Sequence, residues 1–365
     1  MGLFSSLVIF ILWRIVGGYV LEKLNYYLQR VIGKRVNRDI FSDKGDLLLP
    51  CFTIVTYDHI MTLEEYDVTL ENDDVIAIGS YTKAEPYQHH EVIDETVKQV
   101  SKYFEEIGEK KKIPIVELRK DVIPMIHTLT DGTHLLDLFT ALQAKDDYTY
   151  RHNIAVGALS NLLGRWLRLD HQELLQLTTA ALLHDVGKMM IPETILNKPG
   201  KLTAEEYEVI KNHTVYGYNI LKETNGINHR QALVALQHHE RMDGSGYPFG
   251  VNKERIDVFS RIVAVADIFH AMTSNRVYRN PSPFYEVLLQ MNKDTFGALD
   301  PVVTRVFIEK IMNCLIGHSV LLTNGSEGII IMVPTYDPTR PLIQVGDRFI
   351  DLSKDLSVHI EQLLT

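Results

Sequence analysis

Hydrophobic residues recur at spacings of three and four positions through the middle of the chain, from about Leu135 to Cys314. Leu159, Leu162 and Leu163 belong to one such series, and this spacing is typical of helices that bury one face. The pattern predicts a helical domain over residues 135–318, with six or seven helices and no internal repeat. The fold class is therefore expected to be mainly α.

Two helix starts in this domain carry capping signals. Thr203 followed three residues later by Glu206 is a capping box, in which each side chain satisfies a backbone amide of the first turn. Asp300 followed by Pro301 combines an N-cap with proline at the first helical position. Both signals support the helical interpretation.

The pattern changes after residue 318. Hydrophobic runs become short, and the turn pairs Asn324-Gly325 and Gly346-Asp347 separate them. The runs cover residues 320–322, 328–333, 342–345 and 349–351. Residues 319–365 are therefore predicted to form a small antiparallel β module.

The segment before the helical domain, residues 34–134, is predicted to be an accessory, regulatory domain with a connecting helix. Short apolar runs at 46–50 and 52–55 lie next to turn signals such as Asp43-Lys44-Gly45, which predicts short strands and a small helix. From Glu95 to Lys112 charges are many and apolar residues few, which predicts an exposed connecting helix. This domain is expected to be a small α+β unit.

Residues 1–33 are predicted to form an apolar N-terminal helix. The stretch 3–21 is long enough to span a bilayer, but Arg14 near its middle would cost about 2.5–3.5 kcal/mol on insertion scales. Two roles stay open: a membrane contact through residues 3–21, or docking on the body or on a second copy in a homodimer. Basic residues downstream would hold the remaining chain in the cytoplasm, tethered to the inner face of the membrane in the first case.

The composition of the chain argues against some classes of function. The chain has 365 residues and a net charge of −10, which argues against binding a nucleic-acid polymer, where a basic stripe is expected. Its two cysteines, Cys51 and Cys314, provide neither a disulfide framework nor a four-cysteine zinc site. The number of histidines, 15, is unusual.

Several histidines and aspartates interrupt hydrophobic helices, where burial is costly unless the polar groups have partners. His184 and Asp185 end one apolar run, and Asp267 interrupts another. A metal supplies such a partner, because neutral imidazole and carboxylate are both good ligands. The same domain contains three further candidate sites, at His152, His213 and the pair His238-His239.

The adjacent pair His238 and His239 indicates two metals. On a helix their side chains diverge by about 100°, so one metal would rarely use both, whereas two metals roughly 3.5–4 Å apart can. Five histidines and two aspartates would then hold two ions with one carboxylate bridging. The glycine-containing loop that follows, 240–248, is not a dinucleotide fingerprint, since no strand precedes it and Pro248 ends the turn.

These residues resemble the HD-GYP phosphodiesterases, a subgroup of the HD metal-dependent phosphohydrolases that cleave cyclic di-GMP. His184-Asp185 is similar to the HD pair, Val186-Gly187-Lys188 to its usual extension, and Gly246-Tyr247-Pro248 to the GYP triplet. The segment Ile195–Leu202 is similar to the stretch between these motifs. The resemblance covers about residues 140–315 and implies an HD-type helical bundle.

The resemblance also implies roles for individual residues. One metal would take His152, His184, Asp185 and Asp267, and the second would share Asp185 and add His213, His238 and His239. A third metal in some members needs a glutamate where this chain has Tyr148, so two metals are expected. Catalysis would use Asp185 and Lys188, with Lys188 on the scissile phosphate, and the substrate would be bound by Arg276, Arg279, Gly246, Tyr247 and Pro248. No ligand position fits His270, which the sequence leaves as packed or solvated.

The activity implied is hydrolysis of cyclic di-GMP to linear pGpG, with some members continuing to GMP. Iron or manganese is favoured over zinc, since a histidine-rich site with a bridging carboxylate suits six-coordination. Two alternatives stay open. The chain could be a catalytically silent receptor of cyclic di-GMP or of a protein partner, or an HD hydrolase of another nucleotide.

Overall fold

The computed structural model divides the chain into two compact units. One comprises Met1–Ala84 with Asp131–His134, and the other comprises Glu85–Thr130 with Leu135–Thr365. The structure describes residues 31, 34–36, 38–43, 45–49, 53, 55, 57–76, 87–110, 112–130, 135–142, 148–274, 283–295 and 297–364. Apart from residue 31, the predicted apolar helix lies outside these residues, and so does its segment 3–21.

The first unit is a small α+β module. Its strands form two antiparallel pairs, β1 with β4 and β2 with β3. A hydrophobic core that includes Ile60, Leu63 and Leu70 is almost fully buried among these elements. The elements are β1 (Arg35–Val36), β2 (Ile40–Phe41), β3 (Leu47–Leu49), α3 (Tyr57–Glu65), the 3-10 turn η1 (Asn72–Asp74) and β4 (Val75–Ile76).

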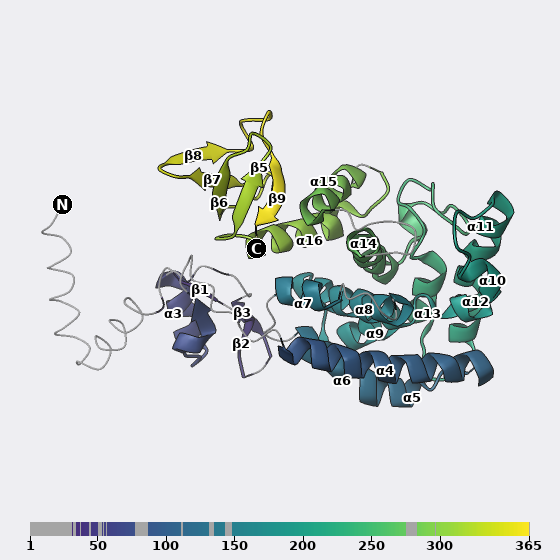
Figure 1. Cartoon of the computed structure of the whole chain (residues 1–365). Coiled ribbons are helices and arrows are strands. Elements are labelled where there is room, and N and C mark those ends of the chain that lie inside the picture. Colours follow the sequence, from purple (N-terminus) through teal and green to yellow (C-terminus); the bar gives the residue numbers. More distant parts are fainter. Residues whose placement is uncertain are drawn as a thin grey trace, which may run out of the picture. The chain divides into compact units, whose positions relative to one another are not determined.

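The second unit is mainly helical, which together with the two small modules confirms the predicted fold class (Figure 1). The expectation of six or seven helices between residues 135 and 314 was too low, because several helices are shorter than the periodicity can reveal. In that span the described residues form α7 (Leu135–Leu142), α8 (Tyr148–Trp166), α9 (His171–Leu182), the 3-10 turn η3 (Val186–Met190), α10 (Glu193–Leu196), α11 (Ala204–Lys211), α12 (His213–Lys222), α13 (His229–Gln237), the 3-10 turn η4 (Lys253–Arg255), α14 (Val258–Thr273), α15 (Phe284–Asp294) and α16 (Pro301–Cys314).

Caps fix several of these helix starts as the sequence predicts. Thr203 and Glu206 form the expected capping box before α11. The side chain of Asp300 accepts hydrogen bonds from two backbone amides at the start of α16, with Pro301 in the first turn. Local sequence thus determines where these helices begin.

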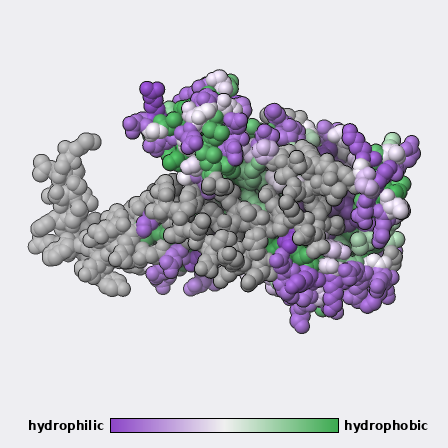
Figure 2. Space-filling view, in the orientation of Figure 1, coloured by the Kyte–Doolittle hydropathy of each residue, from purple (hydrophilic) through white to green (hydrophobic). Residues whose placement is uncertain are grey.

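Helix α4 (Tyr87–Lys110) corrects one expectation. The segment from Glu95 to Lys112 was predicted to be an exposed connecting helix, but Val97, Val100, Phe104 and Ile107 are buried. Their spacing of three and four residues makes a narrow stripe that packs on α6, α7 and α8, while the opposite face is charged. Figure 2 shows this hydrophilic outer face at the lower right. Three short elements follow α4: α5 (Ile115–Glu117), the π-helical turn η2 (Leu118–Val122) and α6 (Ile123–Thr130).

Helix α8 is the centre of the larger unit. It packs against α9 and α14 as well as against α4 and α6 (Figure 1). Its own residues Ile154, Leu159 and Leu163 are buried. A polar side chain on α8 that points toward α9 and α14 therefore enters the interior of the bundle.

The C-terminal module is antiparallel, as the sequence predicts, and consists of five strands in the order β8-β7-β6-β5-β9. Four strands match the predicted runs, and the fifth, β9, pairs with β5. The strands are β5 (Ser319–Leu322), β6 (Glu327–Met332), β7 (Leu342–Val345), β8 (Arg348–Asp351) and β9 (Ile360–Leu364). Within the described part of the chain, no helix combines the length and hydrophobicity that a bilayer crossing requires.

Candidate metal centre

Five elements of the helical bundle bring the seven predicted ligands together. His152 lies in the first turns of α8, and Asp267 lies in α14. His184 and Asp185 occupy the turn between α9 and η3. His213 begins α12, while His238 and His239 directly follow α13. All are buried except His239, whose side chain is 19% exposed, so one edge of the cluster is accessible.

The carboxylate of Asp185 lies between two groups of imidazoles. Its Oδ1 atom is 3.3 Å from Nε2 of His213 and 3.7 Å from Nε2 of His238. Its Oδ2 atom is 3.3 Å from Nε2 of His184 and 3.7 Å from Nε2 of His152. Each oxygen therefore faces a different pair of ring nitrogens, which is the arrangement a bridging carboxylate needs.

Two overlapping groups of donor atoms are compact enough for one ion each. Asp185, His213, His238 and His239 offer ligand atoms within 4.8 Å of one another, and so do His152, His184 and Asp185. Asp185 is the member that both groups share. The first group is the set predicted for the second metal, and the other contains three of the four residues predicted for the first metal.

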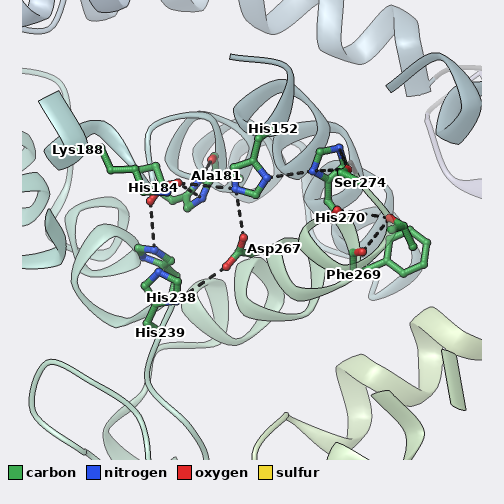
Figure 3. Close-up of polar contacts among 12 residues, drawn as sticks. His152, Ala181, His184, Lys188, His238, His239, Asp267, Phe269, His270 and Ser274 are labelled. Carbon is green, nitrogen blue, oxygen red and sulfur yellow. Dashed lines mark hydrogen bonds and ion pairs between the residues drawn. The ribbon is translucent and has the colours of Figure 1, made fainter. Parts of the chain in front are cut away.

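Asp267 faces the same centre from α14. Its Oδ1 atom lies 3.2 Å from Nε2 of His152, and its Oδ2 atom lies 3.9 Å from Nδ1 of His239 (Figure 3). Burial raises the pKa of Asp267, but the neighbouring His152 outweighs this effect and holds the pKa well below its usual range. The group is therefore an ionised carboxylate aimed at both halves of the cluster.

The second ring nitrogen of three imidazoles is held by backbone carbonyls. His184 donates its Nδ1–H to Ala181 over 2.7 Å, and His213 donates its Nδ1–H to Ile210 over 2.6 Å. His238 donates to Val234 over 3.0 Å. An Nδ1–H proton leaves a lone pair on Nε2, and Nε2 is the atom that faces Asp185.

The cluster contains polar atoms that the described protein groups do not satisfy. Nε2 of His184 and Oδ1 of Asp185 are buried without a hydrogen-bond partner among the described residues. Orphaned donors and acceptors of this kind are expensive in a protein interior. Five imidazoles and two carboxylates around a shared centre fit divalent metal ions, which would occupy both atoms.

Burial also sets the protonation of the imidazoles. It lowers the pKa of His152, lowers that of His238 to about 4, and lowers that of His239 well below its usual range. Burial acts in the same direction on His184, but the charge of Asp185 outweighs it and raises the His184 pKa. Three of the rings are thus neutral at pH 7 and available as ligands.

Lys188 lies at the edge of the cluster. Its ammonium forms an ion pair with Oδ2 of Asp185, and its side chain is 26% exposed. Burial raises the pKa of Asp185, but the charges of Lys188 and His184 lower it well below its usual range. A cation is therefore placed where the buried centre meets solvent.

The predicted GYP loop is anchored to His239, one of the predicted ligands. Tyr247 donates its backbone amide to the carbonyl of His239 over 3.2 Å, and the two rings stack with centroids 4.6 Å apart. A Cβ atom on Gly246 would lie 2.5 Å from the same carbonyl oxygen, so only glycine fits there. Pro248 follows Tyr247 through a cis peptide bond. Burial raises the pKa of Tyr247, which stays neutral.

A buried carboxylate holds the rest of this loop. Glu240, which is 3% exposed, accepts the backbone amides of Phe249 over 2.8 Å and Val251 over 3.0 Å. Glu240 is not among the residues predicted from the sequence. Its position directly after His239 was the available signal, because a carboxylate next to a ligand and before a glycine loop has unpaired amides within reach.

Two further residues near the loop, Lys211 and Tyr207, were not predicted from the sequence. Lys211 lies with its Nζ 4.9 Å from the ring centroid of Tyr207 and 5.7 Å from that of Tyr247. Tyr207 is 45% exposed. An aromatic and cationic surface therefore borders the open edge of the cluster. Arg276 and Arg279, predicted to bind phosphate, lie outside the described residues, and so does the side chain of Tyr148.

The chain was compared with known protein families. Residues 138–303 match the family described as HD domain. The cyclic di-GMP phosphodiesterase PA4108 of Pseudomonas aeruginosa is 38% identical over 223 residues, which cover 58% of this chain and 54% of that protein. A cyclic di-GMP phosphodiesterase of Thermotoga maritima is 42% identical over 166 residues, covering 45% of each chain.

A third relative is named for a different substrate. The 3'3'-cGAMP-specific phosphodiesterase 3 of Vibrio cholerae is 34% identical over 205 residues, which cover 55% of this chain and 44% of that protein. The chain spans about half the length of these curated relatives. Residues 138–303 are thus similar to HD domains, and these relatives support the resemblance to the HD-GYP phosphodiesterases that the motifs predict.

Proposed function

We propose that this chain is a metal-dependent phosphodiesterase that hydrolyses cyclic di-GMP to linear pGpG. The single observation that carries the proposal is the position of Asp185, whose two oxygens face two different pairs of imidazoles. Such a centre matches the two-metal sites that cleave phosphodiesters. The names of the relatives support the choice of a cyclic dinucleotide as substrate.

The proposed ligands are His152, His184, Asp185 and Asp267 for one ion, and Asp185, His213, His238 and His239 for the other. Bound divalent ions supply Lewis acidity and activate water for attack on phosphorus. We propose iron or manganese, because this donor set suits six-coordination. Asp185 would hold both ions, while the carbonyl-anchored imidazoles would keep their Nε2 atoms directed at the centre.

The remaining proposed roles concern the substrate. Lys188, at the accessible edge of the cluster, would pair with the scissile phosphate and stabilise the charge that develops on its oxygens. Tyr247, stacked on His239 in the loop that Gly246 and Pro248 shape, would line the base-binding side. Arg276 and Arg279 are proposed to bind the phosphates. The −10 net charge does not oppose this, because attraction is local to the site.

The test is incubation of the full-length, metal-loaded protein with cyclic di-GMP, followed by chromatography of the nucleotides and elemental analysis of the protein. We expect pGpG to accumulate, and Asp185→Ala to abolish the reaction. 3'3'-cGAMP is the matched second substrate, because one relative is specific for it. Lys188→Ala should lower kcat while the metal content stays unchanged.

Two results would support other functions. Intact cyclic di-GMP that nevertheless binds the metal-loaded protein in calorimetry would indicate a silent receptor. Faster cleavage of another nucleotide would indicate a different HD hydrolase. Further conversion of pGpG to GMP would extend the proposal without contradicting it.

The N-terminal segment is proposed to act in localisation or assembly, and the accessory domain within residues 34–134 in regulation. A membrane contact through residues 3–21 predicts that the full-length protein floats with liposomes, with its HD domain in the cytoplasm. A homodimer through the same helix predicts twice the monomer mass in light scattering. Deleting residues 3–21 should abolish whichever property is found.

A further inference from the structure

We propose that His270 is a positioning residue that fixes the tautomer of His152 in the metal centre. The inference rests on the proposed metal centre, but not on the identity of the substrate. His270 would accept the Nδ1–H of His152, so that Nε2 of His152 keeps the lone pair that a metal needs. The sequence left His270 without a role.

The two imidazoles are in direct contact inside the bundle. His270 belongs to α14, three residues after Asp267, and is 4% exposed. Its Nδ1 atom lies 3.0 Å from Nδ1 of His152, whose own exposure is 3%. Figure 3 shows the His152 ring between the two side chains of α14, with Asp267 toward the metal cluster and His270 on the other side.

His152 differs from the other imidazoles in how its second nitrogen is held. His184, His213 and His238 donate Nδ1–H to backbone carbonyls, and a carbonyl can only accept. The protons of those rings are therefore fixed by the backbone. The partner of His152 is another imidazole, which can accept or donate, so the tautomer depends on His270.

Two proton arrangements fit the 3.0 Å contact between the two Nδ1 atoms. In one, His152 donates Nδ1–H to His270, and Nε2 of His152 carries a lone pair. In the other, His270 donates, and the proton of neutral His152 sits on Nε2, where it meets Oδ1 of Asp267 at 3.2 Å. Only the first arrangement lets His152 bind a metal.

Ser274 can complete the first arrangement. Its hydroxyl oxygen lies 3.1 Å from Nε2 of His270 and can accept the Nε2–H that a neutral His270 carries when its Nδ1 is an acceptor. Ser274 is 5% exposed, so water does not readily replace this contact. The chain Ser274–His270–His152 thus ends with Nε2 of His152 directed at Asp185 and Asp267.

Outer partners of ligating histidines typically contribute about 10–100-fold to metal affinity. We expect His270→Phe, which keeps a ring but removes both nitrogens, to weaken one of two metal sites by about this factor. His270→Asn places Oδ1 where Nδ1 stood and should retain affinity within a few-fold. Ser274→Ala should weaken the same site less than His270→Phe does.

The experiment is chelator competition on the full-length protein with manganese as the probe, together with elemental analysis after dialysis and circular-dichroism melting of the metal-free protein. His127→Phe is the matched control, because His127 is a histidine of α6 that contacts Asn161 and belongs to neither ligand group. Its manganese affinity should equal that of the wild type. If His270→Phe does not fold, the Ser274→Ala and His270→Asn pair carries the test.

Three outcomes separate the explanations. Weaker binding in His270→Phe with rescue in His270→Asn supports the proposal. Equal loss in both variants, or equal affinity in His270→Phe and the wild type, overturns it. A wild-type protein that takes up no manganese would instead contradict the metal centre itself, whatever nucleotide the protein cleaves.

Discussion

The Oδ1 atom of Asp185 lies 3.3 Å from Nε2 of His213, although the two residues belong to different elements. A glycine permits this approach. A Cβ atom on Gly187 would lie 1.9 Å from the carbonyl oxygen of His213 and 2.4 Å from the amide nitrogen of Gly217. The turn η3 therefore packs directly on the backbone of α12, and Gly187 permits the geometry of the proposed metal centre.

We predict that Gly187→Ala separates η3 from α12 and lowers both stability and metal content. The added methyl group meets backbone atoms, which cannot rotate away, so the cost should be at least the 1–3 kcal/mol or so typical of overpacking. Thermal melting and elemental analysis measure the two effects.

Gly108→Ala is the matched control for this substitution. Gly108 lies in α4, and its added Cβ would have only Met189 Sδ within contact distance, at 3.8 Å. Alanine in a helix interior is favoured over glycine by roughly 0.5–1 kcal/mol. Full metal content in Gly187→Ala would show that the close approach is not required.

Removing the shared carboxylate should cost the protein more bound metal than removing a ligand of a single ion. We expect Asp185→Ala to lose both metals, because each of its oxygens faces one group of imidazoles. His213→Ala should retain one metal, since His213 belongs to a single group. Elemental analysis of proteins with matched circular-dichroism spectra distinguishes the metal contents of the two variants. An Asp185→Ala protein that keeps both metal ions would refute the bridging arrangement.

Metal loading should release fewer protons than the number of histidine ligands. Burial lowers the pKa of His152, His238 and His239. These rings are therefore neutral at pH 7 and have no extra proton to release when a metal binds. The raised pKa of His184 makes it a ring that must lose a proton, and protons compete there as the pH falls. Metal affinity should therefore decrease on acidification through the His184 pKa.

Calorimetry in buffers of different ionisation enthalpy counts these protons. The seven-residue centre has five imidazoles, and release of five protons at pH 7 would contradict the assignment of three neutral rings. A metal affinity that does not change on acidification would contradict the raised pKa of His184.

The loop that carries Tyr247 should loosen when Glu240 loses its second acceptor oxygen. Glu240→Gln leaves one of the amides of Phe249 and Val251 without a carboxylate partner, a local cost of about 1–3 kcal/mol. We expect faster amide hydrogen exchange over residues 243–251. Glu254→Gln, an exposed carboxylate of η4, is the control and should leave exchange in the loop unchanged.

Much of this protein follows from its sequence through local rules. The capping box at Thr203 and the N-cap at Asp300 determine helix starts because their hydrogen bonds span only three residues. The turn pairs of residues 319–365 likewise predict the strands around them. The residues proposed as ligands also stand out in the sequence, since a polar side chain in a hydrophobic run signals a buried partner.

The tertiary structure decided what depends on packing between distant elements. Helix α4 appears charged in sequence, yet its narrow hydrophobic stripe is buried, because only a few residues per turn need to face α8. The contact between His152 and His270 joins α8 to α14, and no spacing along the chain predicts a distance of 3.0 Å between them. Sequence determined which residues are available as ligands, whereas the folded bundle decided which oxygen of Asp185 each imidazole faces, because that choice depends on side-chain directions that only close packing fixes.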